Sequence, residues 1–272
     1  MHGKDVKLKR ILENGKTVIV PMDHGASNGP IAGIEEIDSA VSKVSNATAI
    51  ILHKGMIQKI AVPRCGVIMH LSASTSLSPE PNRKVLVGSV REALALGCDG
   101  VSVHVNLGSE FEAEMLSSLG EVSAECEELQ MPLLAMMYVR GKNVASFDPD
   151  AIALSARVAA ELGADIVKCP FTGDVETFKK VVRGCGVPVV VAGGPKMGSD
   201  LEVLKLAEDA IRSGAAGTSI GRNVFQHANP TAMVEALRAV VIGRKRAEEA
   251  ISLLSNSATQ ETLNATALSQ RR

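Results

Sequence analysis

The run Ala-Asp-Ile-Val-Lys-Cys-Pro at residues 164–170 is a short apolar segment that carries a lysine, Lys168, near its end. It follows a helical pattern that stops at Gly163, and glycine is common just after a helix ends. Helix, glycine and buried strand in this order are typical of an αβ unit. Residues two apart on a strand share a face, so we expect Ala164, Ile166 and Lys168 to point the same way.

If that face is interior, Lys168 lies in apolar surroundings at the carboxyl end of a strand. Burial disfavours the charged form, so we expect a lowered lysine pKa and an amine that can attack carbonyl groups. The alternative is a lysine whose long side chain leaves the strand and reaches water. The rest of the chain favours the reactive lysine.

Eight short apolar runs, including the one that carries Lys168, alternate with helical segments along the chain. The runs show little alternation of polar and apolar residues, as expected for parallel strands covered on both faces. Eight such strands in about 250 residues match a (β/α)8 barrel, also called a TIM barrel. We therefore predict an α/β protein with one barrel domain over residues 1–254 and a polar, disordered tail over 255–272. The predicted strands lie near residues 17–22, 49–52, 67–71, 100–105, 132–137, 164–170, 187–192 and 216–220. After the first strand we expect a polar, glycine-rich loop over 23–30 and then a helix over 31–45.

The composition excludes several classes of function. The formal net charge is −1 and the chain has no tryptophan and one tyrosine, so neither a basic stripe nor a stacking platform for nucleic acid is expected. No run approaches the ~18 uninterrupted apolar residues of a membrane span, and the N-terminal segment lacks the apolar core of a signal peptide. The five cysteines contain no CxxC pair, so we expect reduced thiols and a cytoplasmic protein.

Polar residues are scarce within the predicted strands and frequent where the strands stop. Barrel enzymes place their chemistry at this end, and the agreement of several strand ends favours a reactive lysine. A carboxylate at Asp23 could act as a general base or proton shuttle, or it could close an Asx-turn. The single tyrosine, Tyr138, could donate a proton to an alkoxide or carbinolamine, or it could be a packing ring with a wet hydroxyl.

Glycines follow the last two predicted strands, where barrels often bind phosphate. Gly193-Gly194 and Gly221-Arg222 would let backbone N–H groups approach phosphate oxygens, and Arg222 could add charge-assisted hydrogen bonds. No GxGxxG or P-loop pattern occurs, so no nucleotide cofactor is expected. The strand-end histidines form no His-x-His pair or HExxH motif, so we expect no metal and keep only His24 as a substrate contact.

Several segments together resemble the archaeal class I aldolase family, and the resemblance runs from about residue 7 to 240. The segments are Val18–Gly25, His53–Gly55, Ser102–Asn106, Ala135–Tyr138, Gly163–Lys168, Val191–Lys196 and Gly221–Gln226. The resemblance implies an aldolase or transaldolase that uses neither metal nor cofactor. Lys168 would form an imine with a phosphorylated ketose, Tyr138 would donate a proton and Asp23 would accept one.

The resemblance also implies a set of substrate contacts, an assembly and partners. Family members tend to form decamers, so we expect a homo-oligomer whose partners are small sugar phosphates and aldehydes, with no nucleic acid or membrane. The residues expected to hold the substrate are Asp23, His24, Gly25, Ala26, Ser27, Tyr138, Val139, Arg140, Lys168, Cys169, Pro170, Gly193, Gly194, Gly221 and Arg222.

Three functions stay open at this point. One branch of the family transfers a fragment of 6-deoxy-5-ketofructose 1-phosphate to L-aspartate semialdehyde, on the archaeal route to 3-dehydroquinate and aromatic amino acids. A sister branch cleaves fructose 1,6-bisphosphate, and the text around Pro21–Pro30 is less typical of that branch. The third possibility is a barrel that binds sugar phosphates without turnover, for which an imine-forming lysine would be unnecessary.

Overall fold

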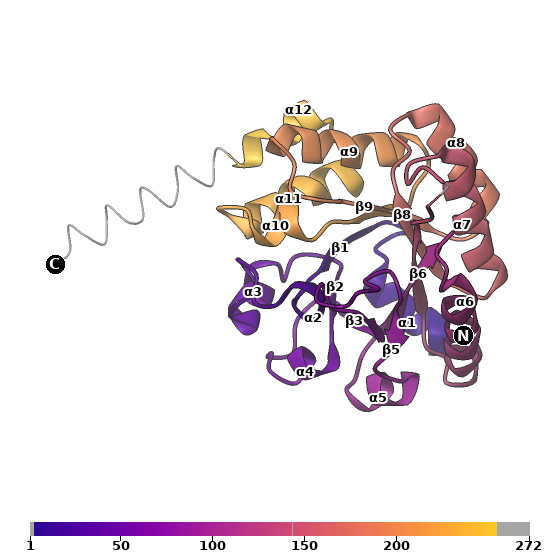
Figure 1. Cartoon of the computed structure of the whole chain (residues 1–272). Coiled ribbons are helices and arrows are strands. Elements are labelled where there is room, and N and C mark those ends of the chain that lie inside the picture. Colours follow the sequence, from indigo (N-terminus) through magenta and orange to yellow (C-terminus); the bar gives the residue numbers. More distant parts are fainter. Residues whose placement is uncertain (1–2, 143, 255–272) are drawn as a thin grey trace.

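Eight parallel strands close on themselves in the order β1-β10-β9-β8-β7-β6-β3-β2, and helices surround them (Figure 1). The computed structural model describes residues 3–142 and 144–254. The predicted (β/α)8 barrel is confirmed, and each of the eight predicted runs overlaps one barrel strand. The predicted tail at 255–272 lies outside the described residues. The barrel strands are β1 (Thr17–Pro21), β2 (Ala49–Leu52), β3 (Gly66–His70), β6 (Gly100–Leu107), β7 (Leu133–Val139), β8 (Ile166–Pro170), β9 (Val189–Ala192) and β10 (Gly217–Ser219).

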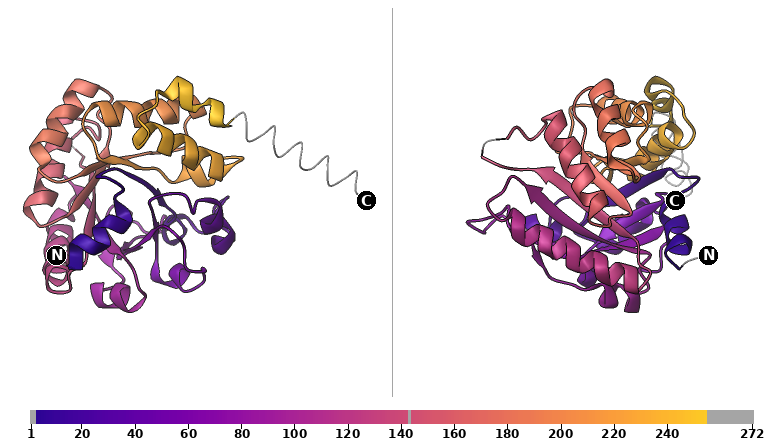
Figure 2. Two further views of the ribbon diagram at one scale, coloured as in Figure 1. Left: turned by 180° about the vertical axis from the view of Figure 1, so that it is seen from behind. Right: turned by 90° about the vertical axis from the view of Figure 1, so that its right-hand side faces the viewer.

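Most of the helices form an outer layer around the strands, as the two views of Figure 2 show. The outer helices are α3 (Ile37–Lys43), α4 (Lys54–Ile57), α5 (Val90–Ala95), α6 (Glu112–Glu128), α7 (Pro149–Glu161), α8 (Val175–Cys185), α9 (Asp200–Arg212), α11 (Pro230–Val241) and α12 (Ala247–Ala250). Side chains of Asp148, Asp174 and Ser199 cap the starts of α7, α8 and α9 by accepting backbone hydrogen bonds. These caps fix where each helix begins relative to the strand before it.

Two local expectations around the first loop are wrong. Residues 31–45 were expected to be helical, but the helix begins only at Ile37, because Gly33 adopts a φ of 90° and passes close to Phe225. Residues 23–30 were expected to form an open loop, but Gly25–Asn28 make one helical turn, α2. The backbone N–H of Asn28 donates to the carbonyl of His24 at 2.9 Å in this turn.

The barrel interior is closed at the amino ends of the strands. Inward side chains such as Ile19, Ile51 and Ile166 form one apolar cluster, and outward side chains form a second, larger cluster beneath the helices. Helix α1 (Gly3–Ile11) inserts Ile11, only 1% exposed, into the interior cluster. The rear view in Figure 2 shows α1 in front of the strands at this end. The carboxyl ends of the strands are therefore the open end.

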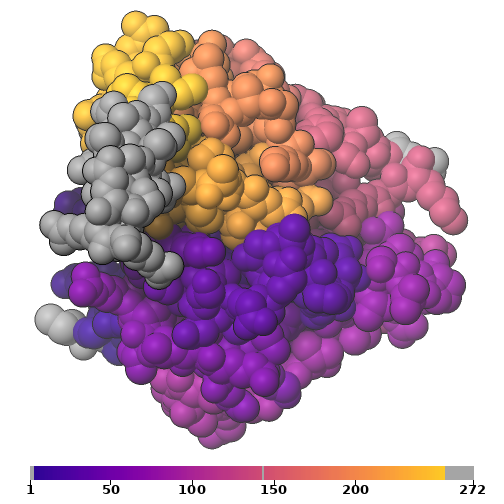
Figure 3. Space-filling model, turned by 90° about the vertical axis from the view of Figure 1, so that its left-hand side faces the viewer, coloured from indigo at the N-terminus to yellow at the C-terminus, as the bar shows by residue number. Residues whose placement is uncertain are grey.

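The first and last parts of the chain lie against each other. Strand β10 pairs with β1, and the surface view in Figure 3 shows the orange and yellow C-terminal helices against the indigo and purple N-terminal segments. Surface bonds join the same parts, including the Arg238 guanidinium and the Glu13 carboxylate at 2.7 Å. Closure of the barrel thus brings the loops after β1 and β10 together at one site.

A two-stranded hairpin stands beside the open end, between β3 and α5. Strands β4 (Ser72–Ala73) and β5 (Val85–Leu86) pair in antiparallel fashion and place Ser74 and Lys84 opposite each other just beyond the ladder. Across the described ranges 3–142 and 144–254, no helix is both long and apolar enough to span a membrane.

Candidate active site

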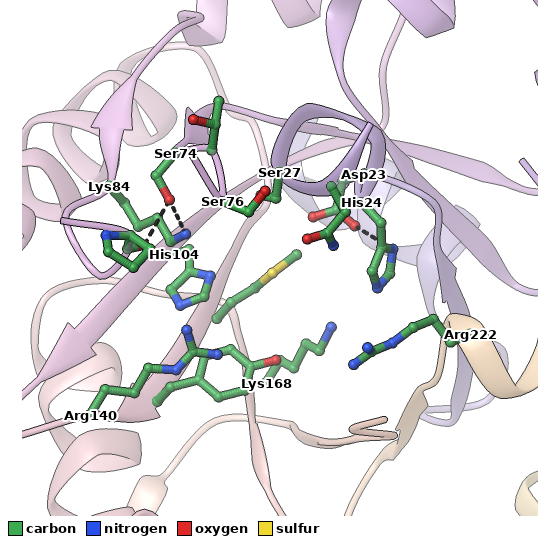
Figure 4. Close-up of a pocket in the computed structure, with 15 residues that line it drawn as sticks. Asp23, His24, Ser27, Ser74, Ser76, Lys84, His104, Arg140, Lys168 and Arg222 are labelled. Carbon is green, nitrogen blue, oxygen red and sulfur yellow. Dashed lines mark hydrogen bonds and ion pairs between the residues drawn. The ribbon is translucent and has the colours of Figure 1, made fainter. Parts of the chain in front are cut away.

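Lys168 lies in the third position of β8 with a side chain that is 6% exposed. Alternation along the strand turns Ile166 inward with it and sends Cys169 into the outer layer. The expectation of an inward-facing lysine is confirmed, whereas Ala164 precedes the strand and packs in the outer layer instead. In Figure 4 the Lys168 side chain reaches into the middle of the pocket, with Arg140 and His104 on one side and Asp23, His24 and Arg222 on the other.

Two cavities meet at Lys168. The hairpin-side cavity, about 330 Å³, is bounded by the loops after β1 and β7 and by the β4–β5 hairpin. The glycine-side cavity, about 690 Å³, is bounded by the loops after β7, β8, β9 and β10. Both are lined by His24, Tyr138, Arg140, Lys168 and Arg222. A ligand attached to Lys168 could therefore extend to either side.

Asp23 follows β1 directly and its carboxylate lies between two histidines. Its Oδ1 is 3.8 Å from His24 Nδ1, and its Oδ2 is 3.8 Å from His70 Nε2. Burial raises the pKa of Asp23, but the positive charges that His70 and His24 carry at low pH, together with Lys168, outweigh burial and hold this pKa at about 2. Burial lowers the pKa of His24 and lowers that of His70 to about 4, so both rings are neutral near pH 7. Asp23 is thus an ionised carboxylate in the wall of the cavity that also contains Lys168.

His70 packs within a hydrogen-bonded network at the end of β3. Its Nδ1 is 2.8 Å from Ser102 Oγ and its Nε2 is 3.4 Å from Ser72 Oγ. The ring also meets His53 edge-on, with centroids 5.2 Å apart. His70 therefore lies between Ser102 and the Asp23 carboxylate and helps to fix the position of this carboxylate. The sequence did not indicate this role, because His70 is an isolated histidine at a strand end.

Tyr138 is held between an imidazole and a guanidinium. Its ring centroid is 4.8 Å from that of His104, and Arg140 Cζ lies 5.0 Å from it. Asn106 Nδ2 donates to the Asn82 carbonyl at 2.8 Å, so Asn106 Oδ1 accepts from His104 Nε2 at 2.8 Å. Burial, together with the charges of Lys84 and Arg140, holds the pKa of His104 well below its ordinary value. The neutral imidazole and the cation fix the phenol at the cavity wall.

The predicted phosphate loops are joined by a residue that sequence reasoning missed, Asn223. Its Oδ1 accepts from Met197 N at 2.7 Å, and its Nδ2 donates to the carbonyls of Gly193 and Pro195 at 3.3 and 2.9 Å. Asn223 lies within the segment Gly221–Gln226, but nothing in the sequence singles out its side chain as a contact between the two loops. Its buried amide fixes the loop after β9 against the loop after β10.

Gly221 and Arg222 form the floor of the glycine-side cavity. A Cβ at Gly221 would lie 2.6 Å from the Pro21 carbonyl oxygen and 2.8 Å from His24 Cε1, so the site requires glycine. Arg222 Nη2 donates to the Gly194 carbonyl at 3.0 Å. Its buried Nε has no hydrogen-bond partner in the part of the chain that the structure describes. An unused donor beside glycine-rich backbone suits an anion.

The structure does not bring all the predicted substrate contacts to the cavities. Gly25 and Ala26 are exposed in α2, and buried Cys169 lies in the outer layer, where burial raises the pKa of its thiol. These three residues line neither cavity, whereas Ser27, Val139, Pro170, Gly193 and Gly194 each line one. Sequence reasoning also missed Lys84 and Ser74, which the hairpin brings to the site. No three His, Cys, Asp or Glu side chains within residues 3–142 and 144–254 are grouped to hold a metal ion.

Comparison with known proteins identifies the class. Residues 17–227 match the family model described as DeoC/LacD family aldolase. The chain is 46% identical over 260 residues to 2-amino-3,7-dideoxy-D-threo-hept-6-ulosonate synthase 1 of Archaeoglobus fulgidus, which covers 94% of this chain and 97% of that one. It is 40% identical over 243 residues to 2-amino-4,5-dihydroxy-6-oxo-7-(phosphonooxy)heptanoate synthase of Streptomyces griseus, covering 86% and 89% of the two chains.

A solved structure agrees with this assignment. An archaeal fructose-1,6-bisphosphate aldolase, whose catalytic lysine is covalently bound to the carbinolamine intermediate of its substrate, superposes with a TM-score of 0.80 at 30% identity. The match covers 88% of this chain and 99% of that one. The barrel and its buried strand-end lysine define an aldolase of class I. The chain belongs to the DeoC/LacD aldolase family.

The low pKa of His70 predicts a pH-dependent loss of stability. Its folded pKa of about 4 lies below the ordinary 6.5, so the unfolded chain binds the proton first as the pH falls. The stabilisation is complete above pH 6.5 and declines from there toward pH 4. At about 1.4 kcal/mol per pKa unit, the loss from this residue approaches about 3 kcal/mol.

Urea unfolding of the native protein and of His70→Asn at pH 7 and pH 4.5 measures this effect. We expect the free energy of unfolding of the native protein to fall more steeply with acidification than that of the variant. Equal slopes for the two proteins would show that His70 is not the group that resists protonation.

Proposed function

We propose that this aldolase is a lysine-dependent transaldolase that makes 2-amino-3,7-dideoxy-D-threo-hept-6-ulosonate. The donor is 6-deoxy-5-ketofructose 1-phosphate, the acceptor is L-aspartate semialdehyde, and the product feeds the route to 3-dehydroquinate and aromatic amino acids. The observation that carries the proposal is a buried Lys168 at the junction of two cavities, beside an ionised Asp23. The 46% identity to a synthase of this name supports the choice of substrates.

The carbon skeleton of the product indicates which bond the enzyme forms. A 6-ketone with a hydroxyl at C4 is the pattern of an aldol addition, so the new bond joins C4 to C5. Carbons 1–4 then come from a four-carbon amino-acid aldehyde, and carbons 5–7 come from the ketose. The acceptor therefore brings a carboxylate and the aldehyde carbon that is attacked.

The reaction begins with Lys168. Its amine attacks the C5 ketone of the donor, Asp23 accepts a proton, and Tyr138 donates one to the carbinolamine oxygen so that water leaves. Once Asp23 has released its first proton to water, it accepts the proton of the C3 hydroxyl while the iminium draws electrons from the breaking C3–C4 bond, and C3 departs as an aldehyde that carries the phosphate. The enamine left on Lys168 attacks the aldehyde carbon of L-aspartate semialdehyde, and Asp23 returns the proton to the new C4 oxygen. Water then hydrolyses the imine to release the product.

A second donor is favoured by the glycine-side cavity. Gly193, Gly194 and Gly221, with the free Nε of Arg222, suit a phosphate on the carbon next to the imine carbon. Dihydroxyacetone phosphate would place its phosphate there and would give a 7-phosphorylated product, as the name of the Streptomyces relative describes. A fructose-1,6-bisphosphate aldolase would use the same lysine and is supported at lower identity.

Borohydride trapping in EDTA tests the proposed chemistry. Incubation with 6-deoxy-5-ketofructose 1-phosphate or dihydroxyacetone phosphate should give an irreversible adduct in the intact mass, and peptide mapping should place it on Lys168. Lys168→Met should give no adduct with either ketose while keeping its circular dichroism spectrum. Absence of an adduct on the native protein, despite measurable ligand binding, would favour a barrel that only senses sugar phosphates.

The fate of phosphorus then separates the two donors in the same experiment. With L-aspartate semialdehyde present, the first donor gives a product without phosphate, because the phosphate leaves with the departing aldehyde. The second donor gives a product that keeps it. Mass spectrometry of the seven-carbon product distinguishes the two, and we expect the phosphate-free product to form faster.

Substitution of Tyr138 tests its role as proton donor. Tyr138→Phe keeps the ring between His104 and Arg140 and removes only the hydroxyl, so we expect kcat to fall by roughly 10²- to 10⁴-fold. The Michaelis constants for both substrates should change little. If kcat falls by less than tenfold, the proton must come from water or from another group.

We also propose that the barrel works as a cytoplasmic homo-oligomer, a decamer by resemblance to its family. The described structure keeps Cys65, Cys98, Cys126, Cys169 and Cys185 as free thiols, which suits a reducing compartment. Light scattering of the purified protein should give the mass of ten chains of 28.5 kDa each. The mass of a single chain at micromolar concentration would contradict the proposed assembly.

A further inference from the structure

Of the four basic side chains that line the hairpin-side cavity, two, Lys84 and Arg140, lie away from Asp23. Lys84 extends from the hairpin and Arg140 from the loop after β7, and both line this cavity. Neither side chain forms an ion pair in the ranges 3–142 and 144–254. Asp23 is the only carboxylate among the residues that line the cavity, and it lies beside Lys168 rather than beside the hairpin. Unpaired cations that face an enclosed space favour an anionic ligand.

The neighbouring cation on the same hairpin shows the contrast. Arg83 turns away from the cavity, and its guanidinium pairs with Glu114 at 2.9 Å and Glu80 at 3.8 Å. Lys84, one residue later, donates to the Ser74 hydroxyl instead. Ser74 is itself held, because it donates to the Pro81 carbonyl at 2.8 Å. Arg83, which faces away from the cavity, is therefore neutralised by carboxylates. Lys84, which faces the cavity, is held by a hydroxyl group and has no carboxylate partner.

The two cations also act on each other across the cavity. Partial burial and the charge of Arg140 lower the pKa of Lys84, whereas the more distant Asp23 carboxylate raises it by a smaller amount, and Lys84 and Arg140 both act on His104. Two positive charges that act on each other are unfavourable when no carboxylate lies between them. Figure 4 places Lys84 and Ser74 above Arg140, with His104 between them, while the amine of Lys168 points to the other side, toward His24 and Arg222. An anion between the two cations would remove this repulsion.

We infer that Lys84, Arg140 and Ser74 form the subsite for the anionic end of the aldehyde partner, which is the carboxylate of the acceptor. The inference rests on the proposed function, since it places the acceptor on the opposite side of Lys168 from the glycine loops. The donor's departing aldehyde carries its phosphate and occupies the same position before it leaves. One cation pair therefore holds each aldehyde in turn at the carbon that reacts with the enamine.

Internal competition between two aldehydes tests this subsite without interference from the donor step. L-Aspartate semialdehyde and uncharged propanal are supplied together, so both compete for the same enamine on Lys168 and the donor half-reaction cancels from the product ratio. We expect Lys84→Met to lower the ratio of the seven-carbon amino-acid product to the propanal product by about 10- to 100-fold. Lys84→Arg should recover most of the ratio, and Arg83→Met, one residue away, should leave it unchanged.

Two further measurements use a phosphorylated aldehyde and an acceptor analogue without an aldehyde. Replacing the semialdehyde with D-glyceraldehyde 3-phosphate tests whether a phosphorylated aldehyde uses the same position: Lys84→Met should lower its product ratio against propanal as well, and an unchanged ratio would overturn the shared subsite. Calorimetric titration with L-2-aminobutyrate, which has the acceptor's chain without its aldehyde, should show binding that Lys84→Met removes. An unchanged product ratio or unchanged 2-aminobutyrate binding in Lys84→Met would overturn the subsite. Loss of borohydride trapping in the native protein would instead overturn the proposed function.

Discussion

The burial of an amine next to a carboxylate at the open end of the barrel is the constraint on which the site depends. Lys168 reaches the interior because β8 alternates, and Asp23 reaches it because β1 ends two residues earlier and turns into α2. An isolated buried carboxylate would be costly, and at Asp23 this cost is offset by His70, His24 and Lys168. Each carboxylate oxygen of Asp23 lies 3.8 Å from a histidine nitrogen, of His24 or of His70, and Lys168 lines the same cavity.

The barrel and the inward lysine could be predicted from the sequence because both depend on short-range patterns. Eight apolar runs and the two-residue period of a strand are enough to place Lys168 and Tyr138 at strand ends. Lys84 and Asn223 could not be found in this way. Lys84 reaches the pocket through a two-stranded hairpin, and Asn223 acts through carbonyls some 30 residues away in the chain. Their roles depend on tertiary contacts that leave no local pattern.

Two other expectations differ from the structure for different reasons. The helix expected from residue 31 starts at Ile37 because Gly33 must pass the Phe225 backbone, a contact between segments far apart in the chain. Cys169 was grouped with its neighbours Lys168 and Pro170, although strand alternation alone would have sent its side chain into the outer layer. In one case the missing information was tertiary, and in the other it was already present in the strand period.

The single tyrosine has a spectroscopic consequence. The chain contains no tryptophan, so Tyr138 is its only strong near-ultraviolet fluorophore. That phenol stands at the wall shared by both cavities, in contact with His104 and Arg140. The emission of the whole protein therefore comes from the reaction centre, and the occupancy of the pocket is observable in real time without any added label.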